Sequence, residues 1–323
     1  LLIDEATILN PAPMAFFNIA SFYIQRSDQT TTTNENGMNK PINDSEHISF
    51  IASDSKGILK GSASYQKFNE TNFSRKRWAV ALASPIGKSS AIGINFRKTK
   101  DEENSSLSEY TQVILGLSHV LDESLSFGLV LIDPLNKKVT DNKGIIGLQY
   151  SYKHLLSLLF DIGGVFYPTY NKDFTIGISL KNFGFLFSKF KDNTTSVLPF
   201  DIQIGSSIKP EYMPLRFSFT VFNIYGGDNL NYNREKLTLN KLISKINFGS
   251  EILINKNIIL QAGYNFMNRN DINYKFSNRN SGFSYGILLK IKRICINYAR
   301  SMHNIQGGTN SINLSLNFKQ LIN

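Results

Sequence analysis

Short segments in which apolar and polar side chains alternate recur along most of this chain. Clear examples begin at Leu59, Ile92, Leu215 and Ile312, and the last one reads Ile-Asn-Leu-Ser-Leu-Asn-Phe. Successive side chains of a β-strand point to opposite faces, so each segment predicts a strand with one apolar and one polar face. More than a dozen such segments in series are typical of a transmembrane β-barrel, with lipid outside and a polar lumen inside.

Connections of two different lengths separate these segments. Short polar turns, such as residues 54–57 and 85–88, alternate with longer connections, such as residues 99–109 and 225–245. Short turns at one rim and long loops at the other are typical of an up-and-down barrel in an outer membrane. The polar residues 26–46 are too many for a hairpin turn and indicate a surface loop.

We expect an even, closed number of about 14 strands, fewer than the segments that show the pattern, so that the first and last strands meet. A short helix is expected in one loop, at residues 235–244, where apolar residues share a helical face. The segments that predict strands are residues 16–25, 47–54, 58–68, 77–84, 90–98, 110–120, 125–132, 144–153, 156–167, 174–183, 198–209, 215–224, 246–254, 258–267, 281–300 and 312–318.

These features predict an all-β fold: a closed, antiparallel transmembrane β-barrel that forms a single domain over residues 1–323. Residues 1–15 are expected to form an N-terminal segment at or in the lumen, and residues 16–318 the barrel. An open sheet in lipid would leave an edge of unpaired amide and carbonyl groups, each costing several kcal/mol, whereas a closed barrel has no edge. No change of composition marks a domain boundary.

Composition narrows the class of protein. Hydrophobic residues make up 41% of the chain, and no apolar run approaches the ~20 residues of a transmembrane helix, so a membrane crossing would use strands. Aromatic residues reach 12%, as expected for a barrel with aromatic rings at both membrane interfaces. The net charge of +10 comes from bases scattered near strand ends, which favours contact with membrane headgroups over nucleic acid.

The single cysteine and the chain start add two expectations. Cys295 excludes an internal disulfide and is expected to be a small packing residue within a strand. The chain begins with Leu1 rather than Met, and no signal segment precedes the strand pattern. We therefore expect a mature or trimmed chain whose export signal is missing.

Several short motifs stand in a defined order in the second half. They are Lys-Asn-Phe-Gly at 181–184, Leu-Pro-Phe-Asp-Ile-Gln-Ile-Gly at 198–205, Pro-Leu-Arg-Phe-Ser-Phe-Thr at 214–220, Phe-Gly-Ser-Glu at 248–251, Ala-Gly-Tyr-Asn at 262–265, Gly-Phe-Ser-Tyr-Gly at 282–286, Ile-Asn-Tyr-Ala-Arg at 296–300 and Gly-Gly-Thr-Asn at 307–310. With Asn-Pro-Ala at 10–12, this order resembles the PorV/PorQ group of FadL-like outer-membrane barrels, its PorQ branch in particular. The region before Leu107 and the residues after Phe318 depart from the family pattern.

The resemblance implies a FadL-like barrel of about 14 strands in a Bacteroidetes-like outer membrane. It also implies a non-catalytic role, in which the barrel anchors a surface partner in the cargo-attachment complex of the type IX secretion system. The expected partners are surface or translocon proteins of that system, outer-membrane lipid and lipopolysaccharide, and not nucleic acid. An alternative role is a FadL-like transporter of hydrophobic small molecules, and an outer-membrane enzyme ranks third.

The sequence predicts no catalytic, cofactor-binding or metal-binding site. The histidines, too dispersed for recognisable metal-ligand spacing, are His47, His119, His154 and His303. Ser118 and His119 would point to opposite faces of a strand, so they cannot act together as a hydrolase site. Two further polar residues lie close by in sequence, Asp122 and Ser124. Carboxylates at strand ends and in loops stay open as catalytic groups, namely Glu70, Asp133 and Asp271.

Charged residues on the predicted inner faces indicate a wet lumen, in which charges pair with one another or line a conduit. These residues are Lys60, Arg97, Asp161, Lys181, Asp201, Arg216 and Glu251. Arg216 and Glu251 are a candidate ion pair. The motif Asn10-Pro11-Ala12 admits two interpretations: it seats the N-terminal segment inside the barrel as a hatch, or it is an ordinary turn before the first strand.

Overall fold

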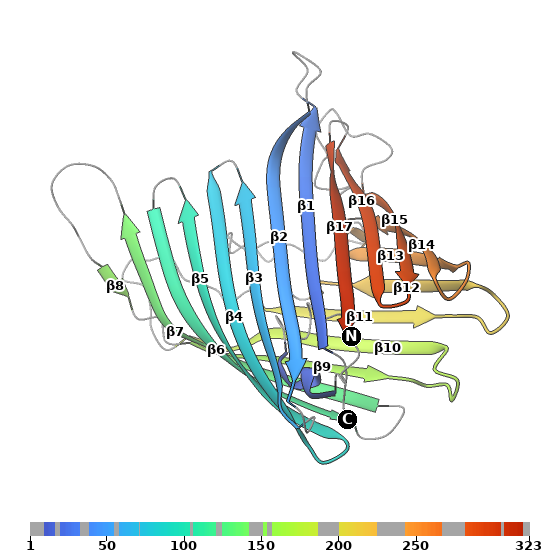
Figure 1. The fold of residues 1–323 in the computed structure, drawn as a ribbon, viewed down its shortest axis with the longest axis horizontal. Helices are drawn as coiled ribbons and strands as arrows, with labels where there is room; N and C mark the ends of the chain where they lie inside the picture. Colours follow the sequence, from blue (N-terminus) through green and yellow to red (C-terminus); the bar gives the residue numbers. More distant parts are fainter. Residues whose placement is uncertain are drawn as a thin grey trace.

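A computed structural model of the chain consists mainly of strands in one antiparallel sheet (Figure 1). The residues that the structure describes are 10–16, 20–32, 39–54, 58–70, 72–103, 106–120, 125–141, 151–153, 157–186, 200–224, 243–266, 282–304 and 307–318. Within them, a 3-10 turn, η1, covers Ala12–Phe16. No helix among these residues has the length and apolar character needed to cross a membrane.

Within the described residues, seventeen strands make up the sheet. Their bounds are β1 (Ala20–Thr32), β2 (Asn39–Ser53), β3 (Lys60–Glu70), β4 (Phe73–Ile86), β5 (Ser90–Glu103), β6 (Ser106–Val120), β7 (Leu125–Asp141), β8 (Ser151–Lys153), β9 (Ser157–Phe166), β10 (Phe174–Leu186), β11 (Asp201–Ile208), β12 (Leu215–Val221), β13 (Ile246–Leu253), β14 (Ile258–Asn265), β15 (Phe283–Ile291), β16 (Ile294–Asn304) and β17 (Gly307–Phe318).

Pairing follows the order of the chain, because antiparallel strands can be joined by tight turns. β7 pairs with both β8 and β9, and β9 pairs with β10, so the short β8 and β9 together continue the ladder beside β7. β1 pairs with β2 on one side and with β17 on the other, where Ala20 lies opposite Phe318 and Thr31 opposite Gly307. The hydrogen-bonded order thus leads from the first strand to the last and back to the first.

The antiparallel all-β prediction is confirmed, but the predicted number and lengths of the strands were wrong. In the part of the chain that the structure describes, the sheet already has seventeen strands rather than about 14. Much of the predicted loop 26–46 is strand, since β1 continues to Thr32 and β2 begins at Asn39. In the same way β5 and β6 extend over most of the predicted loop 99–109. These strand ends carry polar residues on both faces, so they lack the alternation that identifies a strand in a sequence.

Other predictions concern the connections. A turn at Lys292 and Arg293, with a φ of 54° at Lys292, divides the predicted single strand 281–300 into β15 and β16. The predicted helix at 235–244 lies outside the described residues, apart from Ile243 and Ser244, which form a helical turn before β13. The predicted short turns after β2, β4 and β13 lie at one rim, because strand direction alternates through the sheet.

The strands differ in length on the two sides of the molecule. β1 to β7 contain 11 to 17 residues each, whereas β11 to β15 contain 7 to 9. Figure 1 shows the long strands side by side as a tall wall, with the shorter β11 to β13 running across lower down. We call strands β1 to β7 the tall wall and strands β11 to β15 the low wall.

On the tall wall, most large apolar side chains of β4 and β5 face outward, whereas small or polar side chains face inward. Val80 and Leu82 of β4 are 56% and 44% exposed, whereas the alanines between and beside them are buried. On β5, Phe96 is exposed, while Asn95 and Arg97 are buried. Soluble proteins bury their apolar residues instead. This reversed distribution is that of a strand wall between lipid and a wet lumen.

A charge placed in the outer apolar band tests this orientation. We expect Leu82→Arg to lower the free energy of unfolding by about 2–4 kcal/mol in lipid, the cost of a guanidinium near the middle of the membrane. The measurement is urea unfolding in phospholipid vesicles. Ser74→Arg, on the same face of β4 but nearer the rim, should cost less than about 1 kcal/mol. Equal and small effects of both substitutions, as on an ordinary wet surface, would contradict the assignment.

Candidate functional site

The N-terminal turn η1 lies against the inner face of the tall wall. Ala12 and Met14 are 0% exposed and contribute to a buried apolar cluster. The remaining members of that cluster are Ala15, Ile51, Ala81, Ala83 and Ala91, so small side chains of β4 and β5 form much of the seat. η1 contacts β4, β5 and β6. The N-terminal segment therefore covers part of the inner face of the tall wall.

Two facing glycines make room for this segment. Gly93 of β5 and Gly116 of β6 are opposite each other in the ladder. A Cβ atom added to Gly93 would lie 2.7 Å from the backbone nitrogen of Ala12, closer than real Cβ contacts allow, and one on Gly116 would overlap Asn10 Oδ1. The backbone of the segment therefore approaches the sheet at a place where only glycine fits.

Asn10 fixes the segment at this place. Its Oδ1 accepts a hydrogen bond from the backbone nitrogen of Ala12 at 3.0 Å, and its Nδ2 donates to the carbonyl oxygen of Leu117 on β6 at 3.2 Å. The first contact closes a turn within the segment, and the second joins that turn to the wall. Of the two interpretations of Asn10-Pro11-Ala12, the structure supports the first, because the segment is seated on the inner face of the sheet.

The predicted lumen charges lie on the inner face, and one predicted pair is formed. Arg216 Nη1 lies 3.0 Å from Glu251 Oε2, and Gln261 Nε2 donates to the other oxygen of that carboxylate at 3.2 Å. Lys181 and Asp201 lie opposite each other in the ladder between β10 and β11. On the inner face of β10 to β13, charged residues thus lie near residues of opposite charge.

Lys60 is the most enclosed charge of the tall wall among the described residues. It is 2% exposed, and its Nζ donates to Ser53 Oγ at 2.7 Å. Arg97, also predicted to face the lumen, is 8% exposed. Long cationic side chains that are this buried on an inner wall indicate that the interior is polar rather than oily.

A row of polar side chains crosses the tall wall above the seat. Gln25, His47, Gln66, Arg77 and Thr99 are successive ladder partners on β1 to β5. Arg77 Nη1 donates to Gln66 Oε1 at 3.2 Å. We call these five residues the polar row. Sequence reasoning did not bring these five residues together, because they come from five strands and share no motif.

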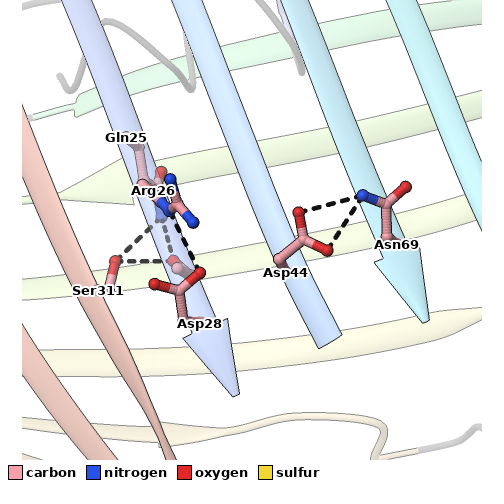
Figure 2. Close-up of polar contacts among 7 residues, drawn as sticks. Gln25, Arg26, Asp28, Asp44, Asn69 and Ser311 are labelled. Carbon is pink, nitrogen blue, oxygen red and sulfur yellow. Dashed lines mark hydrogen bonds and ion pairs between the residues drawn. The ribbon is translucent and has the colours of Figure 1, made fainter. Parts of the chain in front are cut away.

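Near the rim, side chains of β1 and β2 form polar contacts on both faces of the sheet. Gln25 Nε2 reaches Ser311 Oγ at 3.3 Å on the inner face (Figure 2). Arg26 and Asp28, which alternate with Gln25, pair at 3.3 Å on the other face (Figure 2). Figure 2 also shows both carboxylate oxygens of Asp44 accepting from Asn69 on the adjacent strand, at 3.0 Å each. Polar pairs thus occupy both faces near the rim.

A cavity of about 440 Å³ lies along the polar row. Arg75, Arg77, Phe68 and Phe73 line it. The guanidinium of Arg75 donates to both carboxylate oxygens of Asp101, at 2.7 and 2.9 Å. It also lies 5.2 Å from the centre of the Phe73 ring. The cavity therefore combines charged donors with an aromatic wall.

The structure joins His119 to a different serine from the one considered in the sequence. His119 Nδ1 lies 2.7 Å from Ser90 Oγ across β5 and β6. Ser118 falls on the opposite face of β6, as predicted. Glu70 lies exposed at the end of β3. The candidates Asp122, Ser124, His154 and Asp271 lie outside the described residues, and the side chains of Asp133 and His303 are not described.

The residues whose side chains the structure describes include histidines, a cysteine and carboxylates on many strands. Among those residues, no three His, Cys, Asp or Glu side chains come together in a way that could hold a metal ion. Cys295 is a free thiol in β16, opposite Ser315 and Lys290 in the two adjoining ladders.

Comparison with known proteins identifies the fold but not the family. No family model matches the chain, and no curated protein sequence matches it. CdiB from Acinetobacter baumannii aligns over 93% of this chain, with a TM-score of 0.53 and 9% identity, and the alignment spans 60% of CdiB. A bacterial polysaccharide outer membrane secretin aligns over 93% of this chain and 99% of its own length, with a TM-score of 0.51 and 10% identity. A Pseudomonas aeruginosa FadL homologue reaches a TM-score of only 0.41.

The shared fold is that of outer-membrane β-barrel proteins. Together with the apolar outer face of the tall wall, it assigns the chain to the outer membrane, as the sequence predicts. The resemblance to the PorV/PorQ group stays a prediction, since no family model or curated sequence supports it.

The glycine seat can be tested directly. We expect Gly93→Ala to displace the N-terminal segment, because the new methyl group would overlap the backbone of Pro11 and Ala12. Met14→Cys in a Cys295→Ser background should then react several-fold faster with a water-soluble maleimide, as the side chain at 14 leaves its buried site.

Gly61→Ala on β3 is the matched control, since its added methyl would meet only Leu82 at an ordinary 3.7 Å. Equal labelling rates at position 14 in both glycine variants would refute the seat.

Proposed function

We propose that this protein is an outer-membrane transporter: a closed transmembrane barrel through which small molecules pass, with residues 10–16 narrowing the lumen. The observation that carries the proposal is the seating of this segment on Gly93 and Gly116, inside a wall that is polar within and apolar outside. A barrel that served only as a membrane anchor would need neither the segment nor its glycine seat.

The attachment of the segment favours a movable constriction over a permanent core. In the described part of the chain, its side-chain hydrogen bond to the wall is the one from Asn10 to Leu117, and its other contacts are to small apolar residues. One such hydrogen bond contributes about 0.5–1.5 kcal/mol. The segment is therefore held by shape and by modest burial, which a passing solute or a partner can overcome.

Closure of the sheet into a cylinder is part of this proposal. The pairing of β1 with β17 supports it, because both edges that would otherwise be unpaired are then hydrogen-bonded. An unpaired strand edge inside lipid would cost several kcal/mol for each exposed group.

The chemical class of the transported molecule is inferred from the sequence resemblance and from the side chains on the inner face of the tall wall. The resemblance to FadL-like barrels suggests hydrophobic small molecules. The polar row and the buried cations add hydrogen-bonding and charged groups to the lumen. We therefore propose amphipathic small molecules, with an apolar body and a polar or charged head.

Anchoring of a partner in the type IX secretion system is the second candidate. It is favoured by the order of motifs between residues 181 and 310, and the partner would be a surface or translocon protein of that system. Pull-down from gently solubilised outer membranes tests it. Recovery of secretion-system proteins in stoichiometric amounts would favour this candidate over transport.

Solute entry into proteoliposomes tests the transport proposal. We expect Gly93→Ala to raise the rate of liposome swelling in a small neutral solute several-fold over the unchanged protein, because unseating the segment widens the lumen. Gly61→Ala should leave the rate unchanged. Identical rates for both variants and for the unchanged protein, despite the displaced segment, would refute a role for residues 10–16 as the constriction.

A further inference from the structure

The cavity along the polar row has the chemistry of an anion site, and we propose that it binds a small organic anion: a carboxylate carried on an aromatic body. This inference rests on the proposed transport function and deepens it by naming the class of cargo. Three observations support it, namely an arginine with no anionic partner among the described residues, hydrogen-bonding groups beside that arginine, and two aromatic rings that also line the cavity.

Arg77 is the arginine in question. It lines the cavity, its Nη1 donates to Gln66, and its buried Nε has no hydrogen-bond partner. Across the described part of the chain, no carboxylate pairs with it. A guanidinium stays charged at any relevant pH and offers five donors in a planar fork that matches a carboxylate. A partly desolvated fork with donors to spare therefore favours an anion in the cavity.

Arg75, the other arginine that lines the cavity, already has an anionic partner, whereas Arg77 has none among the described residues. Arg75 lies two residues away on the same face of β4, and Asp101 already takes its fork with two hydrogen bonds, at 2.7 and 2.9 Å. Glu46 and Lys67 are ladder partners that alternate with His47 and Gln66, so their charged groups point to the other face of the sheet. The positive charge left over in the cavity is therefore that of Arg77.

The rest of the cavity wall orients the ligand. Gln66 is the ladder partner of Arg77, and His47 is the ladder partner of Gln66, so an amide lies beside the guanidinium and an imidazole one strand beyond it. Phe68 and Phe73 also line the cavity, with ring centres 6.1 Å apart. A carboxylate at Arg77 would thus place its apolar body against these rings. The volume of about 440 Å³ lies within the usual range for small-molecule sites.

Benzoate is a suitable probe, because it carries the carboxylate and the ring and little else. Binding to the detergent-solubilised protein is measured by saturation-transfer NMR and calorimetry, beside benzyl alcohol, which is neutral, and inorganic phosphate, which lacks the ring. We expect benzoate to bind about tenfold or more tightly than either. Arg77→Gln should weaken benzoate binding about tenfold or more, as loss of hydrogen bonds to a charged group does.

Lys76→Gln is the matched control, because it removes the same charge from the adjacent residue, whose side chain points to the other face of β4. It should change benzoate affinity less than about twofold, since a rim charge on the outer face makes no contact with the ligand. Should Arg77→Gln fail to fold, Gln66→Leu replaces it, and the expected result is again weaker binding of benzoate.

Two results would overturn the inference: benzoate affinity that is unchanged in Arg77→Gln, or benzyl alcohol or phosphate that binds as well as benzoate. Swelling of proteoliposomes in a neutral solute is recorded for Lys76→Gln and Gly93→Ala. Lys76→Gln should not alter it and Gly93→Ala should raise it, so failure of the anion site appears in benzoate binding to Arg77→Gln, whereas failure of the transport proposal appears in the swelling of Gly93→Ala.

Discussion

Backbone hydrogen bonding in a medium without water is the constraint on which this structure depends. Every amide and carbonyl group at membrane depth needs a partner within the protein, and each missing one costs several kcal/mol. The long ladders of the tall wall meet this need strand by strand, and the ladder between β1 and β17 meets it where the chain begins and ends. With the backbone satisfied, side chains are free to be apolar toward lipid and polar toward the lumen.

Because the backbone pairs within the sheet, the inner face can consist of small and polar side chains. Alanines and glycines of β4, β5 and β6 leave space beside the sheet, and η1 fills that space instead of side chains from the wall. Higher up, the wall carries the polar row, and the lumen there is open enough to hold a cavity. The same strands therefore provide a packed seat at one level and a polar site at another.

The alternation of residue types was enough to predict the fold class and the facing of single residues. Arg216 and Glu251 were assigned to inner faces and meet there, since both lie on strands with clear alternation. Strand length was underpredicted at the polar ends of β1, β2, β5 and β6, where both faces are wet. The polar row was not predicted, because cross-strand register decides which residues are neighbours, and a single sequence does not display it.

The unequal walls have a consequence for the surrounding lipid. Eight residues of strand span about 26 Å along the strand, and a tilt of about 40° reduces this to a height of about 20 Å. The strands of the low wall have 7 to 9 residues, so their height falls short of the apolar band of about 25 Å that transmembrane barrels present. A bilayer matches a short hydrophobic surface by thinning beside it. The bilayer should therefore be thinnest, and its lipids least tightly packed, beside β11 to β15.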